Sequence, residues 1–465
     1  MTHASWWGDP LLDTGADRLP WLISRTAQSR AELRSAVTEL NRELAGYGIG
    51  NRSTVMVRMA PSVTYLHLML ALWSRGAQVI LVDFRSTPTE YEPLTRLLDP
   101  QFLIVSPEPT GPVAGLHDDV AFQVHRRASG VPASSDACLV QFSSGSTGRP
   151  KVIGRTPASL LAEIDRHVAL DRLPRAGERL LVLNSIVHTM GLVTGVLYAL
   201  HVGATVVLAP NTRPAEVLRL ARDTGVAAVY GVPAHIELLT RVGEVPPLPD
   251  LRLVLSGGER LPLDVYESFH RQFGVPVSQV YGVTETGLLV AGLDGPRPPV
   301  VGMVVPGVEA KLVDQELYVR CDASPYVFDD QPDRYVDGWL RTYDRFAMSG
   351  ETGELSMLGR SDSLVIIRGL KLDLTEVESV VLAHPRVSEA VVTYGEVIEA
   401  FVAGENPPDQ AELTRWCYER LSLFKVPKRF VITGALPRNK TGKVVRNRTM
   451  IMEQLQIQNQ GAGSD

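Results

Sequence analysis

Apolar residues recur along most of the chain in two spacings, which predict helices alternating with buried strands. Leu33, Val37 and Leu40 follow one another at three or four residues, as on the inner face of a helix. Ser29 and Glu32 form a capping box that favours a helix start there. Shorter runs rich in β-branched residues are typical of strands covered on both faces, and they lie at 54–59, 78–82, 102–105 and 137–142. We therefore predict a mostly parallel sheet for this part of the chain.

The same alternation of predicted helices and strands continues through the middle of the chain, and two different patterns follow it. Five more runs have the character of buried strands, at 180–183, 204–208, 226–230, 251–255 and 278–281. From about residue 301 the predicted strands become short, with alternating apolar and polar residues, as in a small antiparallel unit. Beyond Gly359 a further compact set has strands expected at 364–367, 389–392 and 400–402, with helices at 375–383 and 410–421.

This order of elements predicts an α/β protein with two domains. The large N-terminal domain, residues 1–361, would comprise two α/β subdomains and a small β-barrel-like unit. A small α+β domain would form the C-terminal part, residues 362–465. The length of 465 residues is consistent with two or three compact units.

Composition and charge argue against several kinds of partner. With 46 Lys and Arg against 52 Asp and Glu, the net charge of −6 gives no reason to expect nucleic acid or an anionic membrane. The three cysteines, Cys138, Cys321 and Cys417, fit no disulfide framework or zinc pattern. The uncharged run 184–211 is interrupted by glycines and histidines, so it is expected to be a buried helix and strand and not a membrane span. Because no basic-then-apolar signal opens the chain, the expected location is cytoplasmic.

The segment from Phe142 to Lys151, Phe-Ser-Ser-Gly-Ser-Thr-Gly-Arg-Pro-Lys, carries the first candidate chemistry. It follows a predicted buried strand, and open α/β sheets bind ligands at the carboxyl ends of their strands. Glycines let backbone N–H groups turn toward one point, and hydroxyls and a lysine add donors for phosphate oxygens. The spacing differs from the Walker pattern, so a P-loop fold is not implied. Read alone, the segment is either a polar surface loop or a phosphate cradle formed by Ser143, Ser144, Gly145, Ser146, Thr147, Gly148 and Lys151.

Six further motifs follow along the chain: His188-Thr-Met-Gly191, Ser256-Gly-Gly-Glu259, Tyr281-Gly-Val-Thr-Glu285, Asp337-Gly-Trp-Leu-Arg-Thr-Tyr-Asp344, Gly359-Arg-Ser-Asp362 and Leu436-Pro-Arg-Asn-Lys-Thr-Gly-Lys443. With the serine- and glycine-rich segment, this ordered set resembles the adenylate-forming superfamily, which includes acyl-CoA synthetases, adenylation domains of nonribosomal peptide synthetases and firefly-type luciferases. A lone histidine or a Gly-Gly pair also has an ordinary explanation, as a core residue or a tight turn. The order of the whole set favours the functional reading.

The resemblance implies a role for each motif in an ATP-dependent reaction. The implied nucleotide contacts are the loop 143–151 at the phosphates, Gly257, Gly258 and Glu259 along the adenine, Tyr281 and Gly282 at its face, and Asp344 and Arg360 at the ribose. The implied catalytic residues are His188 beside the acyl pocket, Thr284 at the α-phosphate, Glu285 as the Mg²⁺ ligand, and Lys443 as a positive charge for the transition state. Gly369 would line the tunnel for an acceptor thiol, and the small domain would be mobile about a hinge at Asp362.

Several positions depart from the family pattern or admit two readings. Tyr343 stands where a glycine is usual, which predicts a changed turn before Asp344 if that glycine needs a positive φ. Ser363 replaces a common aspartate, and Leu374 replaces a proline. The stretch from Lys425 to Arg448 carries eight Lys or Arg and no acid. It is either a solvated basic face or positive charge brought to the reaction.

The function predicted from the sequence is an adenylate-forming ligase that uses ATP and Mg²⁺. A carboxylic acid would become an acyl adenylate with release of pyrophosphate, and an acceptor would then displace AMP. Family frequency favours CoA as the acceptor. A carrier-protein thiol, an amine or activation of another oxyacid stays open, as does a degenerate nucleotide-binding protein without turnover.

The same resemblance narrows the class of carboxylic acid that is expected as substrate. The segment 184–191 contains no aspartate, which disfavours an α-amino acid. The pocket residues expected from the motifs favour an aryl or small branched acid; they are Ile186, Val187, Val232, Pro233, Gly282 and Val283. Tyr343 and a loop after Val392 that is shorter than in typical members favour a specialised role in secondary metabolism.

Overall fold

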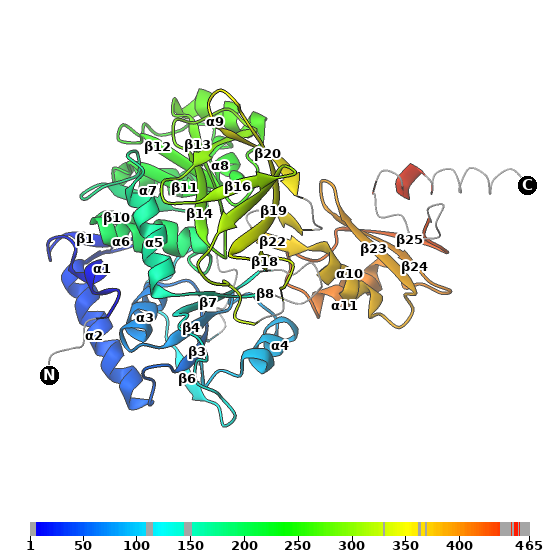
Figure 1. Ribbon diagram of the computed structural model, residues 1–465, viewed down its shortest axis with the longest axis horizontal. Helices are drawn as coiled ribbons and strands as arrows, with labels where there is room; N and C mark the ends of the chain where they lie inside the picture. Colours follow the sequence, from blue (N-terminus) through cyan, green and yellow to red (C-terminus); the bar gives the residue numbers. More distant parts are fainter. Residues whose placement is uncertain are drawn as a thin grey trace, which may run out of the picture.

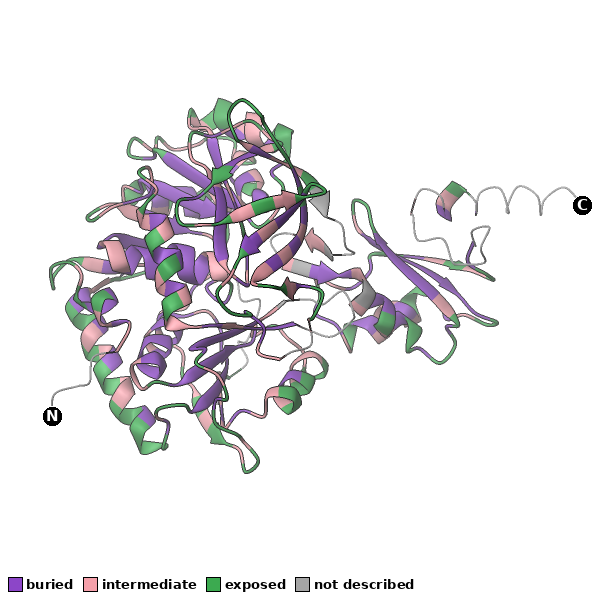
Figure 2. Ribbon diagram, in the orientation of Figure 1, coloured by how far each residue is buried: buried purple, intermediate pink, exposed green. Residues whose placement is uncertain are grey.

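The computed structural model describes residues 6–107, 115–143, 151–328, 331–360, 364–367, 370–437, 448, 451–453 and 455, and it shows a large α/β domain with a smaller domain at its side (Figure 1). Strands fill the interior of the large domain and are largely buried, and helices lie around them (Figure 2). The predicted fold class is confirmed.

The first sheet of the large domain has six strands in the order β6-β5-β3-β4-β7-β8. These strands are β3 (Thr54–Arg58), β4 (Gln78–Leu81), β5 (Phe102–Val105), β6 (Gln123–Arg126), β7 (Leu139–Ser143) and β8 (Lys151–Arg155). The inner four strands pair in parallel, and β6 and β8 are antiparallel edges. The inner four coincide with the four apolar runs of the sequence.

The helices next to this sheet differ in how deeply they are buried. They are α1 (Asp9–Asp13), α2 (Arg30–Gly46), α3 (Val63–Ser74) and α4 (Pro88–Leu98). The expected capping box starts α2, because Ser29 and Glu32 each accept a hydrogen bond from the other's backbone N–H. Helix α3 is buried along most of its length, whereas in α4 only Leu94 is buried. Helix α4 is therefore left with polar faces, one of which meets the small domain.

The second sheet joins a parallel part to an antiparallel part. The parallel strands are β1 (Pro20–Ile23), β10 (Thr205–Val207), β9 (Arg179–Val182), β11 (Ala228–Gly231), β12 (Leu253–Gly257) and β13 (Val277–Val283). The antiparallel part continues from β13 through β14 (Gly287–Gly292), β15 (Val300–Val304), β20 (Leu355–Arg360), β19 (Trp339–Met348), β17 (Glu316–Arg320) and β16 (Ala310–Val313). Strand β2 (Ala27–Ser29) pairs with β1 at the far edge, and β18 (Tyr335–Val336) pairs with β19. The small antiparallel unit is thus continuous with the second α/β subdomain.

Helices of the second subdomain include the one expected from the uncharged run. They are α5 (Pro157–Val168), the π-helix η1 (Met190–Leu197), which continues into α6 (Tyr198–Val202), and then α7 (Pro214–Asp223), α8 (Pro233–Thr240) and α9 (Leu263–Phe273). The run 184–211 therefore forms a buried helix followed by strand β10, as predicted. In the described part of the chain, no helix combines the length and apolar character that crossing a bilayer requires.

The small domain packs two helices on one face of a three-stranded sheet. Its elements are the hairpin β21 (Leu364–Ile367) and β22 (Leu370–Asp373), α10 (Leu374–Leu382), β23 (Glu389–Tyr394), β24 (Ile398–Ala403), α11 (Gln410–Tyr418) and β25 (Arg429–Thr433). Val377 of α10 shares a core with Val402, whereas Phe401 faces a second cluster that contains Leu436 and Ile451. Alternate residues of β24 thus serve the two faces of this sheet.

Candidate active site

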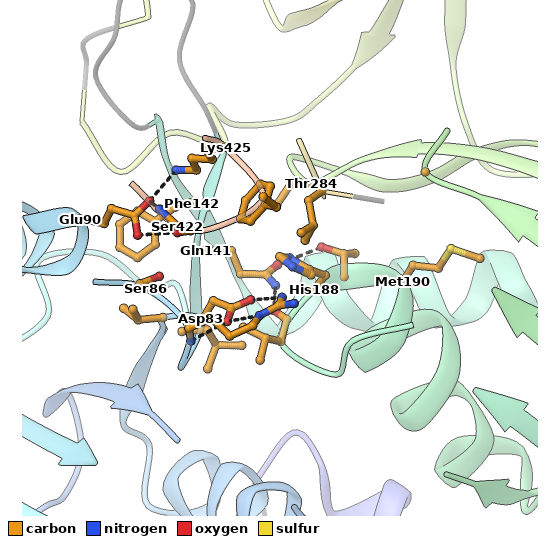
Figure 3. A pocket seen from close by; sticks show the side chains of 18 of the residues that line it. Asp83, Ser86, Glu90, Gln141, Phe142, His188, Met190, Thr284, Ser422 and Lys425 are labelled. Carbon is orange, nitrogen blue, oxygen red and sulfur yellow. Dashed lines mark hydrogen bonds and ion pairs between the residues drawn. The ribbon is translucent and has the colours of Figure 1, made fainter. Parts of the chain in front are cut away.

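A cavity of about 470 Å³ lies where the two sheets of the large domain meet the small domain. Its walls come from the segments that follow β4, β9 and β12, from the ends of β7 and β13 and the start of β14, from helices α4 and α5, and from two segments of the small domain. Figure 3 shows the side chains of Asp83, Gln141, His188, Thr284 and Lys425 around this space. The cavity therefore has the position at the carboxyl ends of strands where open α/β sheets bind ligands.

Tyr281 and Asp344, which the resemblance assigns to adenine and ribose, are in direct contact. The Tyr281 hydroxyl donates a hydrogen bond to Asp344 Oδ2 at 2.6 Å, and the Tyr281 ring meets Phe346 edge-on with centroids 5.0 Å apart. Asp344 is 3% exposed, and its backbone pairs with that of Arg360 between β19 and β20. The adjacent strands β19 and β20 thus bring the backbones of Asp344 and Arg360 together. The side chain of Arg360 is outside the described part.

The residue before Asp344 has a left-handed backbone, so Tyr343 adopts a positive φ of the kind that usually favours glycine. Tyr343 itself has a φ of +65°. Its ring lies against the guanidinium groups of Arg334 and Arg341, each 4.2 Å from the ring centroid, and its N–H donates to Glu316 Oε1 at 3.2 Å. Left-handed backbone costs a non-glycine residue about 1–2 kcal/mol, and cation–π contacts of about 0.5–2 kcal/mol each offset that cost.

Thr284 and Glu285 follow β13 at the edge of the cavity. Glu285 is 9% exposed and accepts a hydrogen bond from the Tyr326 hydroxyl at 3.1 Å. Burial, together with the Glu285 carboxylate, raises the pKa of Tyr326 far above its ordinary value, so this hydroxyl remains a donor. Thr284 lines the cavity, and its carbonyl accepts a hydrogen bond from Arg155 Nη1 at 3.3 Å. Glu285 does not itself line the cavity, but a buried carboxylate next to Thr284 is a suitable partner for a hard cation that also binds phosphate oxygens.

The Gly257–Gly258 pair forms another part of this edge. Gly257 ends β12, and a Cβ there would lie only 2.7 Å from Val280 Cγ2. Gly258 has a φ of +86° and lines the cavity, and Glu259, which follows it, is half-buried. Close packing at one position and left-handed backbone at the next explain why two glycines stand here.

Gln141 holds the segment that carries His188. Its Nε2 donates to the carbonyl of Val187 at 2.9 Å, and its Oε1 accepts from Thr189 Oγ1 at 2.9 Å. Gln141 belongs to β7 and is 4% exposed. One buried amide therefore ties the first sheet to both neighbours of His188, whose side chain borders the cavity (Figure 3).

Asp83 and Arg85 form an ion pair on the cavity wall. Arg85 Nε donates to Asp83 Oδ1 at 2.9 Å and Nη2 donates to Oδ2 at 2.6 Å. Burial alone would raise the pKa of Asp83, but the hydrogen bonds and charge of Arg85, with a smaller contribution from His188, hold that pKa below its ordinary value. The pair therefore presents a largely neutralised polar surface to the cavity.

Several predicted residues lie outside the described part of the chain. They are Ser144, Gly145, Ser146, Thr147, Gly148, Asp362, Gly369 and Lys443. The two ends of the phosphate loop are placed: the backbones of Ser143 and Lys151 pair with each other between β7 and β8, and Lys151 is 3% exposed. The loop thus connects two antiparallel neighbours beside the cavity.

The small domain meets α4 through a contact that we call the docking contact, formed by Glu90, Ser422 and Lys425. Lys425 Nζ lies 3.1 Å from Glu90 Oε1 and 2.8 Å from Glu376 Oε1, and the Ser422 N–H donates to Glu90 Oε1 at 3.0 Å. Burial alone would lower the pKa of Lys425, but the carboxylates of Glu376 and Glu90 raise it above its ordinary value.

Three of the basic residues that the structure describes in the C-terminal stretch are paired with acids, so this part is not simply a solvated face. Lys425 is paired with two acids, and Arg429 and Arg448 both pair with the buried Glu399. The acids that neutralise them lie elsewhere in the sequence.

The sequence matches two family models along most of its length. The sequence model of AMP-binding enzymes matches residues 18–323, and that of the AMP-binding enzyme C-terminal domain matches residues 376–443. The chain belongs to the AMP-binding enzymes. This AMP-binding enzyme is 30% identical over 344 residues to a 2-succinylbenzoate–CoA ligase from Bacillus licheniformis, covering 67% of this chain and 70% of the relative.

Other relatives extend over more of the chain. The enzyme is 27% identical over 473 residues to a p-hydroxybenzoic acid–AMP ligase of Mycobacterium tuberculosis, covering 92% of this chain and 65% of the relative. Among solved structures, o-succinylbenzoate CoA synthetase from Bacillus subtilis superposes with a TM-score of 0.81 at 24% identity, covering 96% of this chain and 98% of that one. Membership of the adenylate-forming superfamily and the prediction of an adenylate-forming ligase are confirmed.

The cavity of this AMP-binding enzyme contains only part of the predicted site. His188, Gly258, Tyr281, Gly282 and Thr284 line it. Of the expected acyl-pocket residues, Val187 and Val283 line it as well, whereas Ile186, Val232 and Pro233 do not. Ile186 instead packs in the main hydrophobic core, and Val232 and Pro233 form the start of α8.

Sequence reasoning missed Asp83, Arg85, Gln141 and Glu163, which also line the cavity. Gln141 carried a usable signal, because it is the one polar residue between Leu139 and Phe142 in a buried run. Glu163 carried none, since a glutamate on an amphipathic helix ordinarily faces solvent.

Proposed function

We propose that this enzyme activates an aromatic carboxylic acid as its acyl adenylate with MgATP and then transfers the acyl group to the thiol of CoA. One observation carries the proposal: a single cavity extends from Tyr281 and Thr284 to the segment of the small domain around Lys425. Such a space has room for an activated acid at the nucleotide end and for an acceptor that enters beside the small domain. The relatives named as CoA or AMP ligases of succinylbenzoic and hydroxybenzoic acids support the aromatic class.

In the first half-reaction, a carboxylate oxygen of the acid would attack the α-phosphorus of ATP, and the bond to the bridging oxygen would break to release pyrophosphate. Tyr281 and Asp344 would hold the adenosine, the loop 143–151 would hold the phosphates, and Thr284 would reach the α-phosphate. Mg²⁺ bound at Glu285 would neutralise phosphate charge. Lys443 would add positive charge as the transition state forms. Positioning and charge neutralisation would thus do the catalytic work, with no covalent enzyme intermediate.

In the second half-reaction, the acceptor sulfur would attack the acyl carbon, AMP would leave with the electrons of the C–O bond, and the thiol proton would pass to solvent. Residues 362–465 would move as the small domain about Asp362, and Gly369 would line the thiol path. The docking contact would hold that domain against α4. These assignments follow the family resemblance and are compatible with the position of Leu370 and Lys425 on the cavity wall.

The test is pyrophosphate release by the purified enzyme with MgATP and a panel of aryl, branched and straight-chain acids. We expect release with aryl acids, and formation of the acyl-CoA by mass spectrometry when CoA is added. Asp344→Ala should weaken ATP binding about ten- to hundredfold, because a charge-assisted hydrogen bond is lost. Absence of pyrophosphate release with every aryl acid would overturn the proposal. Release with an amine-coupled product in place of the thioester would move the acceptor from CoA to an amine.

A further inference from the structure

Glu163 of α5 is a carboxylate on the cavity wall with one oxygen unused. Its side chain has a relative exposure of 1%, and it lines the cavity together with Gly287 and Leu288. Oε2 accepts a hydrogen bond from Arg155 Nη2 at 2.9 Å. Among the residues that the structure describes, none donates a hydrogen bond to Oε1. Buried carboxylate oxygens almost always have a partner, so this one calls for an explanation.

The carboxylate occupies this position because residue 287 has no side chain. A Cβ at Gly287 would lie 1.9 to 2.2 Å from the three carboxyl atoms of Glu163, which is far inside van der Waals contact. Gly287 also has a φ of +78°, which L side chains rarely adopt. Glu163 therefore fills, on the wall of the cavity, the space where a side chain of β14 would stand.

Arg155 neutralises Glu163 but is committed to other partners as well. Its Nε donates to Ser159 Oγ, its Nη1 to the Thr284 carbonyl, and its Nη2 to the Ser159 carbonyl in addition to Glu163. These contacts fix the guanidinium on the Oε2 side. Oε1 is buried, but Glu163 lines the cavity and its terminal torsion is broad, so a small turn that keeps the Oε2 contact with Arg155 lets a donor in the cavity reach Oε1.

We propose that Glu163 selects the acid substrate: its Oε1 accepts a hydrogen bond from an amino or hydroxyl substituent on the ring of the aromatic acid. The inference rests on the proposed function and narrows it from aromatic acids to those that carry a hydrogen-bond donor. A ring without a donor leaves the buried oxygen unpaired, and a ring that carries an acceptor places two acceptors together. Discrimination of this kind is strong because the penalty falls on a buried polar group.

The first experiment uses the unmodified enzyme. The probes are benzoate and its ortho, meta and para amino, hydroxy and methoxy derivatives, with kcat/KM measured for pyrophosphate release. At one ring position, we expect the amino or hydroxy acid to exceed both benzoate and the methoxy acid by at least about tenfold. If all the acids that react do so within threefold of one another, the inference is overturned while the proposed function stands. If no aryl acid reacts, the proposed function itself has failed.

The second experiment exchanges the acceptor for a donor. In Glu163→Gln, the fixed guanidinium of Arg155 pairs with the amide oxygen, so the amide NH₂ takes the place of Oε1. We expect the preference to reverse, with the methoxy acid now favoured over the amino acid at the same ring position. A purely structural role for Glu163 predicts instead an equal loss for every acid, and that outcome would also overturn the inference.

Glu178→Gln is the matched control for that variant. Glu178 pairs with Arg252 through two hydrogen bonds, of 2.9 and 2.8 Å, and does not line the cavity. The same substitution there should leave the ratio between amino and methoxy acids unchanged. Circular dichroism checks the folding of both variants, and should Glu163→Gln fail to fold, the substrate series on the unmodified enzyme decides the matter alone.

Discussion

Two contacts between a glutamate and a basic side chain border the same cavity, and they differ in what they join. Glu163 and Arg155 belong to adjoining elements of the large domain, and each side chain is 1% exposed. Glu90 and Lys425 come from different domains, and their side chains are 10% and 16% exposed. The first contact persists as long as the large domain is folded. The second exists only while the small domain is docked.

Because of this difference, the two ion pairs are expected to stabilise different things: the first the folded large domain, the second the docked position of the small domain. Removing one partner of a buried ion pair inside a domain leaves an uncompensated charge, so it acts on folding. Under the proposed hinge movement of the small domain, removing one partner of a contact between domains shifts the equilibrium between docked and undocked positions. The inner pair should therefore govern stability and the shape of the acid site, and the docking contact should govern the step that needs the small domain in place.

The largest effect is expected from breaking the inner pair. Arg155→Met leaves the Glu163 carboxylate buried without its cation and removes the hydrogen bond to the Thr284 carbonyl. We expect the free energy of unfolding to fall by about 3–5 kcal/mol, measured by urea denaturation. Arg252→Met, which breaks the more exposed pair with Glu178, is the control and should cost about 1 kcal/mol or less. Similar losses in the two variants would show that burial does not distinguish these pairs.

A smaller and more selective effect is expected from the docking contact. Lys425→Met removes the cation that Glu90 and Glu376 share, so the docked position loses charge-assisted hydrogen bonds worth about 1.5–3 kcal/mol. We expect acyl transfer to CoA to slow by about ten- to hundredfold, while adenylate formation stays within about threefold. The two half-reactions are timed separately, with hydroxylamine trapping the adenylate.

The control for that prediction is Lys428→Met, since Lys428 is exposed and lies three residues further along the same segment. It should leave both half-reactions unchanged. An equal slowing of the two half-reactions by Lys425→Met would contradict a role specific to docking.

The mildest perturbation is pH. Burial opposes ionisation of Glu90, but the charge of Lys425 and hydrogen bonds from Ser422 and Thr87 hold the pKa of Glu90 below its ordinary value. The stabilisation that ionised Glu90 gives to the docking contact is complete above the pKa of a free glutamate, about 4.3. It is lost as the pH falls through the lower pKa of Glu90 in the folded protein. Lys425, whose pKa is raised, contributes fully below about pH 10.4 and loses its contribution as the pH rises through the higher folded value.

Docking should therefore be insensitive to pH near neutrality and weaken on the acid side. Small-angle scattering from pH 7 to pH 3 should show the radius of gyration rising before circular dichroism reports unfolding. Glu90→Gln should remove most of this pH-dependent rise in the radius of gyration. A radius of gyration that stays constant until unfolding would mean that Glu90 does not contribute to docking.

The sequence predicted the elements and the motif residues better than it predicted their surroundings. The inner strands of both sheets were found because each buried run is mostly apolar and rich in β-branched residues. Tyr281 and Asp344 were found through motifs, although only the pairing of β13, β14, β15, β20 and β19 in one sheet explains how they meet. Glu163 was missed because its burial depends on the absence of a side chain at Gly287, more than a hundred residues away. Lys425 was assigned to a basic stretch because its acidic partners, Glu90 and Glu376, lie in distant segments.

The left-handed turn at Tyr343 bears on which neighbours this position needs. A tyrosine there with neither Arg334 nor Arg341 beside it would have carried the backbone strain unrelieved, next to the carboxylate assigned to the ribose. With both arginines present, the ring gains two cation–π contacts at the position where the strain arises. The two arginines therefore stabilise the backbone conformation at Tyr343 as well as its ring. Loss of either arginine would leave part of that strain unrelieved, so the residue type at 343 limits which residues positions 334 and 341 can accept.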